Sequence, residues 1–182
     1  MLRWRPRNGN AHRAHLTRPY SLFFFLAALA TGCGGNDTLR NPPLATSANE
    51  GVVVSVADGD TFDLEIAGKR DTVRLIRVDT PETKHPTKGI QCWGPEASDF
   101  TKSLLAVGTR VRLVRDAESR DRYGRLLAYV YLADTNVFVN RELVRLGFAR
   151  PYPFEPNTTH KTTFADAAWE AQGARRGLWG AC

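Results

Sequence analysis

Short runs of β-branched and apolar residues, each bounded by turn residues, predict five β-strands. The first run ends at the Asp58-Gly59 dipeptide, which favours a hairpin, and the third ends at the Thr80-Pro81 break. The five expected strands cover residues 52–56, 61–66, 73–78, 111–114 and 126–131.

Apolar residues spaced three or four apart predict three helices. Gly94-Pro95 opens the first helix, because proline suits the first helical position, and Gly108 ends it. A short amphipathic helix is expected over 139–146. Thr163, with Asp166 three residues later, predicts the start of the last helix. This order of elements favours an α+β domain in which a five-stranded barrel carries helices on its outside.

Residues 1–32 predict a secretion signal. They contain five arginines and no acid, and the apolar run Leu22 to Ala30 is too short to span a bilayer. The segment Leu29-Ala30-Thr31-Gly32-Cys33 resembles a bacterial lipoprotein processing box, which implies an acylated Cys33 and a lipid anchor in the membrane. Ordinary cleavage after Ala30 is the alternative. We therefore expect an exported bacterial protein, anchored in the outer membrane or periplasmic, and otherwise secreted.

Residues 33–50 are rich in Gly, Asn, Pro, Ser and Thr, a composition typical of a flexible tether. The folded domain is therefore expected over 51–182. The net charge of +6 is no evidence for a polyanionic partner, because five of the positive charges lie in residues 1–32. Any attraction for such a partner must come from the local placement of charges.

The cysteines predict one disulfide. If Cys33 carries lipid, Cys92 and Cys182 are left as an even pair in an oxidising compartment. The alternative is that both are buried free thiols.

Three segments contain residues suited to chemistry. Asp60 begins a strand and could project from a barrel rim, although Asp58-Gly59-Asp60 alone is more typical of a structural turn. Arg74 lies within an apolar strand, where a guanidinium needs an anionic partner. The alternative role for Arg74 is to pack on Asp60 and hold the fold. Asp79 and Glu82 flank the Thr80-Pro81 break and offer hard oxygen ligands suited to Ca²⁺ or Mg²⁺.

The third segment is the basic turn Arg120-Asp121-Arg122-Tyr123-Gly124-Arg125. Such turns are usually only solvated, but an arginine at a strand start can bind a phosphate through two hydrogen bonds. Two acids for a metal, a further carboxylate and two arginines together are what phosphoryl transfer requires.

These motifs closely resemble the staphylococcal nuclease (thermonuclease) family. The resemblance rests on blocks that keep their order and spacing over residues 51–180: Asp58-Gly59-Asp60-Thr61, Arg74 with 78–86, Gly94-Pro95-Glu96-Ala97, 121–129, 140–145 and 156–160. It implies an OB-fold barrel with three helices, and a monomeric, Ca²⁺-dependent endonuclease that cuts DNA and RNA and leaves 3′-phosphate ends.

The resemblance also implies a role for each matching residue. Asp60, Asp79 and the Thr80 carbonyl would bind calcium, and Glu82 would orient or deprotonate the attacking water. Arg74 and Arg125 would bind the phosphate, and Arg122, Tyr123 and Tyr152 would contact the nucleotide. The chain departs from the family at Phe154, where the family has tyrosine, and at Cys92-Trp93, which replaces a lysine-tyrosine pair.

Two other classes of protein compete with an enzyme. OB barrels commonly bind nucleic acid without cleaving it, so a non-catalytic binding module is the main alternative. Such a module could lose Glu82 or an arginine freely, whereas this chain has all five residues expected to carry the chemistry. A lipid-anchored structural protein would explain the signal but not the acids and arginines.

Overall fold

The structure is a computed structural model that describes residues 48–83 and 89–182. The expected signal, Cys33 and the tether as far as residue 47 lie outside these residues. No helix in the part of the chain that the structure describes is both long and apolar enough to cross a membrane.

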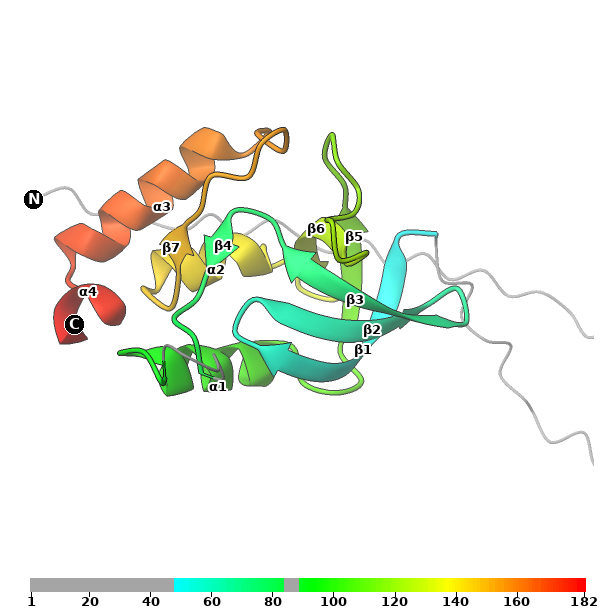
Figure 1. The fold of residues 1–182 in the computed structure, drawn as a ribbon, viewed down its shortest axis with the longest axis horizontal. Helices are drawn as coiled ribbons and strands as arrows, with labels where there is room; N and C mark the ends of the chain where they lie inside the picture. The colour runs from blue at the N-terminus through cyan, green and yellow to red at the C-terminus, as the bar shows by residue number, and fades with distance from the viewer. Residues whose placement is uncertain (1–47, 84–88) are drawn as a thin grey trace, which may run out of the picture. The chain divides into compact units, whose positions relative to one another are not determined.

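Five strands close into a barrel in the order β1-β2-β3-β6-β5 (Figure 1). Neighbouring strands are antiparallel except β3 and β6, which run parallel. The predicted five-stranded α+β barrel is thus confirmed, with strands at β1 (Glu50–Asp58), β2 (Thr61–Ile66), β3 (Lys69–Leu75), β5 (Arg110–Val114) and β6 (Leu126–Leu132).

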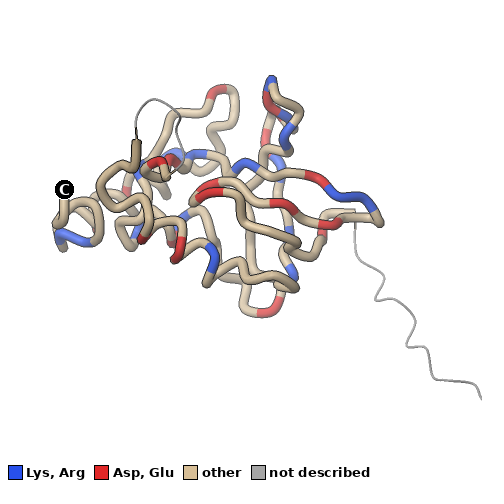
Figure 2. Tube along the Cα trace, turned by 60° about the horizontal axis from the view of Figure 1, so that its bottom comes forward, with Lys and Arg blue, Asp and Glu red and all other residues tan. Residues whose placement is uncertain are grey.

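The barrel interior follows from the alternation of side chains along each strand. On β2, Phe62 and Leu64 are fully buried, whereas Glu65 is exposed. Alternate residues of a strand point to opposite faces, so one face of each strand fills the core. Lys and Arg are interspersed with Asp and Glu over the described part of the domain (Figure 2). The overall charge therefore does not indicate where an anionic ligand would bind.

Three helices of seven residues or more confirm the expected helices. They are α1 (Gly94–Leu104), α2 (Val139–Arg145) and α3 (Lys161–Gly173), and a short α4 (Leu178–Ala181) follows. Helix α1 packs along β1, whereas α2 and α3 pack together near the end of the barrel marked by β4 (Val78–Asp79) and β7 (Arg150–Pro151) (Figure 1).

The expected start of the last helix at Thr163 is wrong. Helix α3 begins at Lys161 and has no side-chain cap. The Lys161 amide donates to the Thr158 carbonyl at 3.0 Å, and the Phe164 amide donates to the His160 carbonyl at 3.2 Å. A backbone turn over 158–161 therefore begins the helix, and Thr163 already lies within it.

The third strand also differs from the prediction, because it stops at Leu75 instead of continuing to Val78. Arg77 has the left-handed backbone angle φ of 61°, which an extended strand cannot accommodate. Its buried side chain donates from Nε to the Asn157 carbonyl at 3.2 Å. After this turn β4 pairs with β7, with Asp79 opposite Arg150. The break therefore moves Asp79 out of the barrel wall and onto a two-stranded sheet at its rim.

Candidate active site

Arg74 is fixed on β3 by three contacts. Its Nη2 lies 3.0 Å from Asp60 Oδ2, and both side chains are largely buried, with 11% and 14% of their surface exposed. Its Nη1 donates to the carbonyls of Leu75 at 2.8 Å and Val78 at 2.6 Å. These contacts hold the guanidinium at the point where the chain leaves the barrel. The contact with Asp60 also means that the fold-holding role of Arg74 is real.

Asp60 lies beside the segment that carries Asp79. The Thr80 amide lies 3.4 Å from Asp60 Oδ2, and Thr61 donates its hydroxyl to Asp60 Oδ1 at 2.9 Å. Gly59 makes this approach possible, since a Cβ there would lie 2.6 Å from Thr80 Oγ1. The turn between β1 and β2 therefore has no room for a side chain where it packs on Thr80.

Arg125 is held by Asp121, a residue for which the sequence pattern alone predicts no role. Arg125 donates from Nε to Asp121 Oδ2 at 2.7 Å, and the amides of Tyr123 and Arg125 donate to Oδ1 at 2.9 and 3.0 Å. Burial raises the pKa of the Asp121 carboxyl, but the hydrogen bonds from Arg125 and Tyr123 outweigh it and lower the pKa below its usual range. Asp121 thus stays ionised and orients the arginine.

Tyr123 and Tyr152 offer open aromatic surfaces next to these charges. Tyr123 is 68% exposed and Tyr152 is 47% exposed. The guanidinium carbons of Arg122 and Arg125 lie 4.8 and 5.4 Å from the centre of the Tyr123 ring. An aromatic ring that is exposed beside cations suits a nucleobase and its phosphate.

One cavity of about 590 Å³ brings most of the predicted residues together. Its walls are supplied by β3, β4, the 121–125 turn and the segment after β7. The side chains lining it are Arg74, Asp79, Glu118, Asp121, Arg122, Tyr123, Arg125, Tyr152, Pro153, Phe154 and Glu155. Within the described residues, Asp60, Thr80 and Glu82 lie outside this lining, although Asp60 contacts Arg74 and Thr80 directly follows Asp79.

The backbone of Glu82 is fixed beside this cavity. Its amide donates to Gln91 Oε1 at 2.9 Å, and its carbonyl accepts from the Gln91 amide at 2.9 Å. Its side chain is partly buried. Glu82 therefore has a defined main-chain position two residues after Thr80.

The side chains that could hold a metal are few. Among residues 48–83 and 89–182, no three acidic, histidine or cysteine side chains cluster as a metal site. The set expected from the sequence contains only two carboxylates, Asp60 and Asp79, with a backbone carbonyl. The 3.4 Å approach of the Thr80 amide to Asp60 Oδ2 places Asp60 beside the backbone that carries Asp79 and Thr80. All are hard oxygen donors, so the residues fit Ca²⁺ and leave positions for water and substrate.

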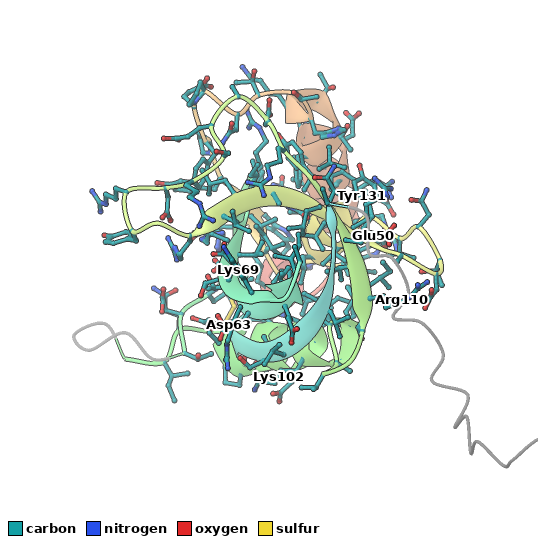
Figure 3. The ribbon with its side chains drawn as sticks, turned by 90° about the vertical axis from the view of Figure 1, so that its right-hand side faces the viewer. Glu50, Asp63, Lys69, Lys102, Arg110 and Tyr131 are labelled. Carbon is teal, nitrogen blue, oxygen red and sulfur yellow. A yellow bond between two sulfur atoms is a disulfide. The ribbon has the colours of Figure 1, made fainter. Side chains whose placement is uncertain are left out.

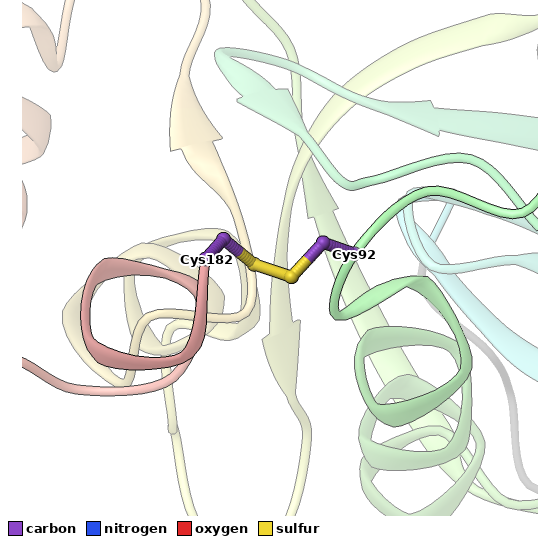
Figure 4. Close-up of a disulfide and its surroundings, with 2 residues drawn as sticks. All are labelled: Cys92 and Cys182. Atoms are coloured by element: carbon purple, nitrogen blue, oxygen red, sulfur yellow. A yellow bond between two sulfur atoms is a disulfide. The ribbon is translucent and has the colours of Figure 1, made fainter.

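Cys92 and Cys182 are joined by a disulfide with an S–S distance of 2.10 Å (Figure 4). The bridge links the residue two before α1 to the last residue of the chain, after α4. Both cysteines are exposed, so the alternative of two buried thiols does not apply. The bridge lies at the edge of a second cavity of about 240 Å³, lined by Asp79, Pro81, Gln91, Cys92, Arg150 and Cys182.

Other acid–arginine pairs have a structural role. Asp63 accepts from Arg70 at 2.7 Å, Thr72 at 2.6 Å and Ser55 at 2.9 Å. Hydrogen bonding from Thr72 and Arg70 lowers the pKa of Asp63 against the effect of burial. Figure 3 labels Asp63, from the middle of β2, and Lys69, at the start of β3, seen from the side that carries the β2–β3 hairpin. This cluster ties β1, β2 and β3 together.

Known proteins share this sequence over most of its length. The pattern of the staphylococcal nuclease homologue family matches residues 72–181. A thermonuclease of Staphylococcus hyicus is 40% identical over 136 residues, covering 74% of this chain and 79% of the relative. A thermonuclease of Staphylococcus intermedius is 42% identical over 128 residues, covering 70% and 74%. Endonuclease YncB of Bacillus subtilis (strain 168) is 37% identical over 150 residues, covering 79% and 70%. The family match begins within β3 and includes all the residues that line the rim cavity, and the chain belongs to the staphylococcal nuclease homologue family.

Proposed function

We propose that this chain is a calcium-dependent endonuclease that hydrolyses phosphodiester bonds of DNA and RNA and leaves 3′-phosphate ends. The observation that carries the proposal is the rim cavity, in which Arg74 and Arg125 line the same space as Asp79 and the exposed rings of Tyr123 and Tyr152. Relatives named thermonuclease and endonuclease support hydrolysis over binding alone.

The two arginines bind the scissile phosphate. Each guanidinium is held by a carboxylate on one side, Arg74 by Asp60 and Arg125 by Asp121, and both line the cavity. Donors fixed before the reaction oppose the charge that grows on the phosphate oxygens, at no cost of reorganisation. The tyrosine rings stack against the base and orient the sugar-phosphate backbone.

Glu82 is the group that orients the attacking water and accepts its proton at the carboxylate. Asp60, Asp79 and the Thr80 carbonyl would hold the calcium ion. When bound, the ion neutralises charge on a phosphate oxygen and lowers the pKa of water. A site with two carboxylates binds calcium weakly, in a range of about 10⁻⁴ to 10⁻³ M that is typical of extracellular modules.

Export fits this weak site. The predicted signal, and the lipid expected on Cys33, would put the enzyme in the periplasm or on the outer membrane, or release it from the cell, where calcium is plentiful. The disulfide supports the same location, because such bonds persist in oxidising compartments. We expect the enzyme to act as a monomer.

A plasmid cleavage assay tests the proposal. Wild-type protein should cut DNA and RNA in millimolar Ca²⁺ and leave both intact in EGTA. Glu82→Gln should abolish cleavage and retain the fold, whereas Glu65→Gln, the same exchange at an exposed position of β2, should leave cleavage unchanged. Intact plasmid with wild-type protein and Ca²⁺ would favour the non-catalytic binding module.

A further inference from the structure

We propose that Gln91 is a positioning residue for Glu82 and that the Cys92–Cys182 disulfide holds Gln91 in place, an inference that rests on the proposed nuclease function. The disulfide then controls turnover through the water-activating residue. It leaves the phosphate-binding arginines unaffected, since these are fixed by other contacts.

Gln91 binds both main-chain polar groups of Glu82. Its side-chain oxygen accepts from the Glu82 amide at 2.9 Å, and its own amide donates to the Glu82 carbonyl at 2.9 Å. The first bond fixes the peptide before the Glu82 Cα, and the second fixes the peptide after it. With both planar peptides held, the φ and ψ angles of Glu82 are set, and so is the direction in which its side chain leaves the backbone.

The turn that carries Gln91 packs directly on the same carbonyl. The Gly94 amide donates to the Gln91 carbonyl at 3.0 Å. A Cβ on Gly94 would lie only 2.8 Å from the Glu82 carbonyl oxygen. Between them Trp93 has a left-handed φ of 67°, a conformation costly for a bulky residue. A tight turn with a strained residue needs an external anchor to keep its position.

The disulfide supplies this anchor from a rigid part of the fold. Cys182 follows α4, whose Leu178 amide donates to the Gly147 carbonyl at 2.9 Å. Gly147 and Gly177 approach so closely that a Cβ on Gly177 would lie 2.2 Å from the Gly147 carbonyl oxygen. The C-terminus is therefore fixed on the segment between α2 and β7. The bridge passes this rigidity to Cys92 and its neighbour Gln91.

The bridge is accessible to a reductant. Both cysteines are exposed, and they line the cavity of about 240 Å³ that also contains Gln91 and Asp79. A small dithiol reduces the bond in two steps. One of its thiolates attacks a cysteine sulfur and releases the other cysteine as a thiolate. Its second thiol then closes into a cyclic disulfide, which leaves two protein thiols and the oxidised reagent.

The first experiment removes the side-chain hydrogen bond. Gln91→Met keeps the length of the side chain but has no strong acceptor for the Glu82 amide. Net loss of one such bond corresponds to about fivefold in rate, and a misplacement of about 1 Å costs up to about 100-fold. We therefore expect kcat to fall by about 5- to 100-fold with KM unchanged. Gln91→Glu keeps the acceptor and should retain most of the activity. Gln172→Met, at an exposed site on α3, is the matched control.

The second experiment reduces the disulfide. Dithiothreitol should lower kcat of the wild type over the same range with KM unchanged, and it should not affect the Cys92→Ser/Cys182→Ser double variant, which starts at the lower value. Amide hydrogen exchange of Glu82, followed by NMR in EGTA, supplies a readout apart from activity. Exchange should speed up in Gln91→Met and after reduction. Circular dichroism verifies that each sample is folded at the assay temperature.

The outcomes distinguish a failure of this inference from a failure of the proposed nuclease function. If oxidised wild-type protein does not cleave DNA in Ca²⁺, the proposed nuclease function is itself overturned. An active wild type whose kcat is unchanged by Gln91→Met would overturn the positioning role of Gln91. If Gln91→Met lowers kcat but reduction does not, the claim that the disulfide holds Gln91 is overturned.

Discussion

The two arginines that we propose bind the phosphate should differ sharply in what their removal does to stability. Arg74→Ala deletes a guanidinium that contacts Asp60 and donates to the carbonyls of Leu75 and Val78. Arg125→Ala deletes one whose partner is Asp121, four residues earlier in the same turn. Both variants should lose nuclease activity, but only Arg74→Ala should lose much of the stability of the fold.

The magnitudes follow from burial. The side chains of Arg74 and Asp60 are 11% and 14% exposed, so Arg74→Ala leaves a largely buried carboxylate without its cation. Breaking a buried pair costs about 3–5 kcal/mol, and the remaining solvent access reduces this to about 2–4 kcal/mol. Arg125 is 30% exposed and Asp121 is 10% exposed. After Arg125→Ala, Asp121 still accepts from the amides of residues 123 and 125, so this local pair contributes about 0.5 kcal/mol. With a urea slope of about 2 kcal/mol/M, the midpoint should fall by about 1–2 M for Arg74→Ala and about 0.3 M for Arg125→Ala.

Urea unfolding followed by tryptophan fluorescence measures both shifts. The titrations are run in EGTA, because a metal that binds only the folded state would add its own stabilisation. Equal midpoints for the two variants would refute the reasoning, since they would mean that the contacts of Arg74 do not hold the chain where it leaves the barrel.

Three further outcomes are expected. Asp121→Asn should lower kcat/KM by about 10- to 100-fold, because Arg125 loses the charge that orients it. Steady-state kinetics will measure this, with circular dichroism to verify that the variant is folded. Phe154→Tyr should tighten binding of a single-stranded oligonucleotide in EGTA, because it adds a hydroxyl in the cavity; unchanged affinity would exclude that contact. Burial raises the pKa of Asp116, but hydrogen bonds from Thr159 outweigh it and hold the folded-state pKa below the ordinary 3.8. This stabilisation is complete above pH 3.8 and is lost as the pH falls through the folded value, so acid titrations of Asp116→Asn should show a weaker loss of stability.

Much of the fold was predictable because its signals are local. Asp58-Gly59 marked the first hairpin and Gly94-Pro95 marked the start of α1, and both lie where the sequence placed them, although α1 ends at Leu104 and not at the expected Gly108. The end of β3 was not predictable in this way. Ile76 and Val78 continue the apolar pattern, whereas the turn depends on contacts of Arg77 far along the chain. Its Nε donates to the Asn157 carbonyl, and its carbonyl accepts from the Tyr152 amide.

In the candidate site too, residues with a local sequence signal were predictable and those fixed by contacts between distant segments were not. Arg74 was noticed because a charge within an apolar strand needs a partner, and Asp60 supplies it. Asp121 was missed as the orienting group, although an acid four residues before an arginine was available as a signal. The hydrogen bonds between Gln91 and Glu82 could not be inferred from the sequence. A single exposed glutamine in a loop belongs to no periodic pattern, and its partner is determined only when the turn has folded.

The pairing of β4 with β7 has a consequence for the order in which the enzyme is completed. Strands β1 to β3 meet through short connections, and β6 brings Arg125 next to them. The two arginines that we propose bind the phosphate therefore come from the first two-thirds of the chain. Asp79, in contrast, pairs with Arg150, which is made only after α2. Contacts between distant parts of a chain form late, because the chain must first lose the conformational entropy of closing a long loop. The bridge from Cys92 can close only after Cys182, 90 residues further along the chain, has been made. A nascent chain can therefore hold a barrel and both arginines before Asp79 is paired with Arg150 and before the turn at Gln91 is joined to Cys182 by the bridge.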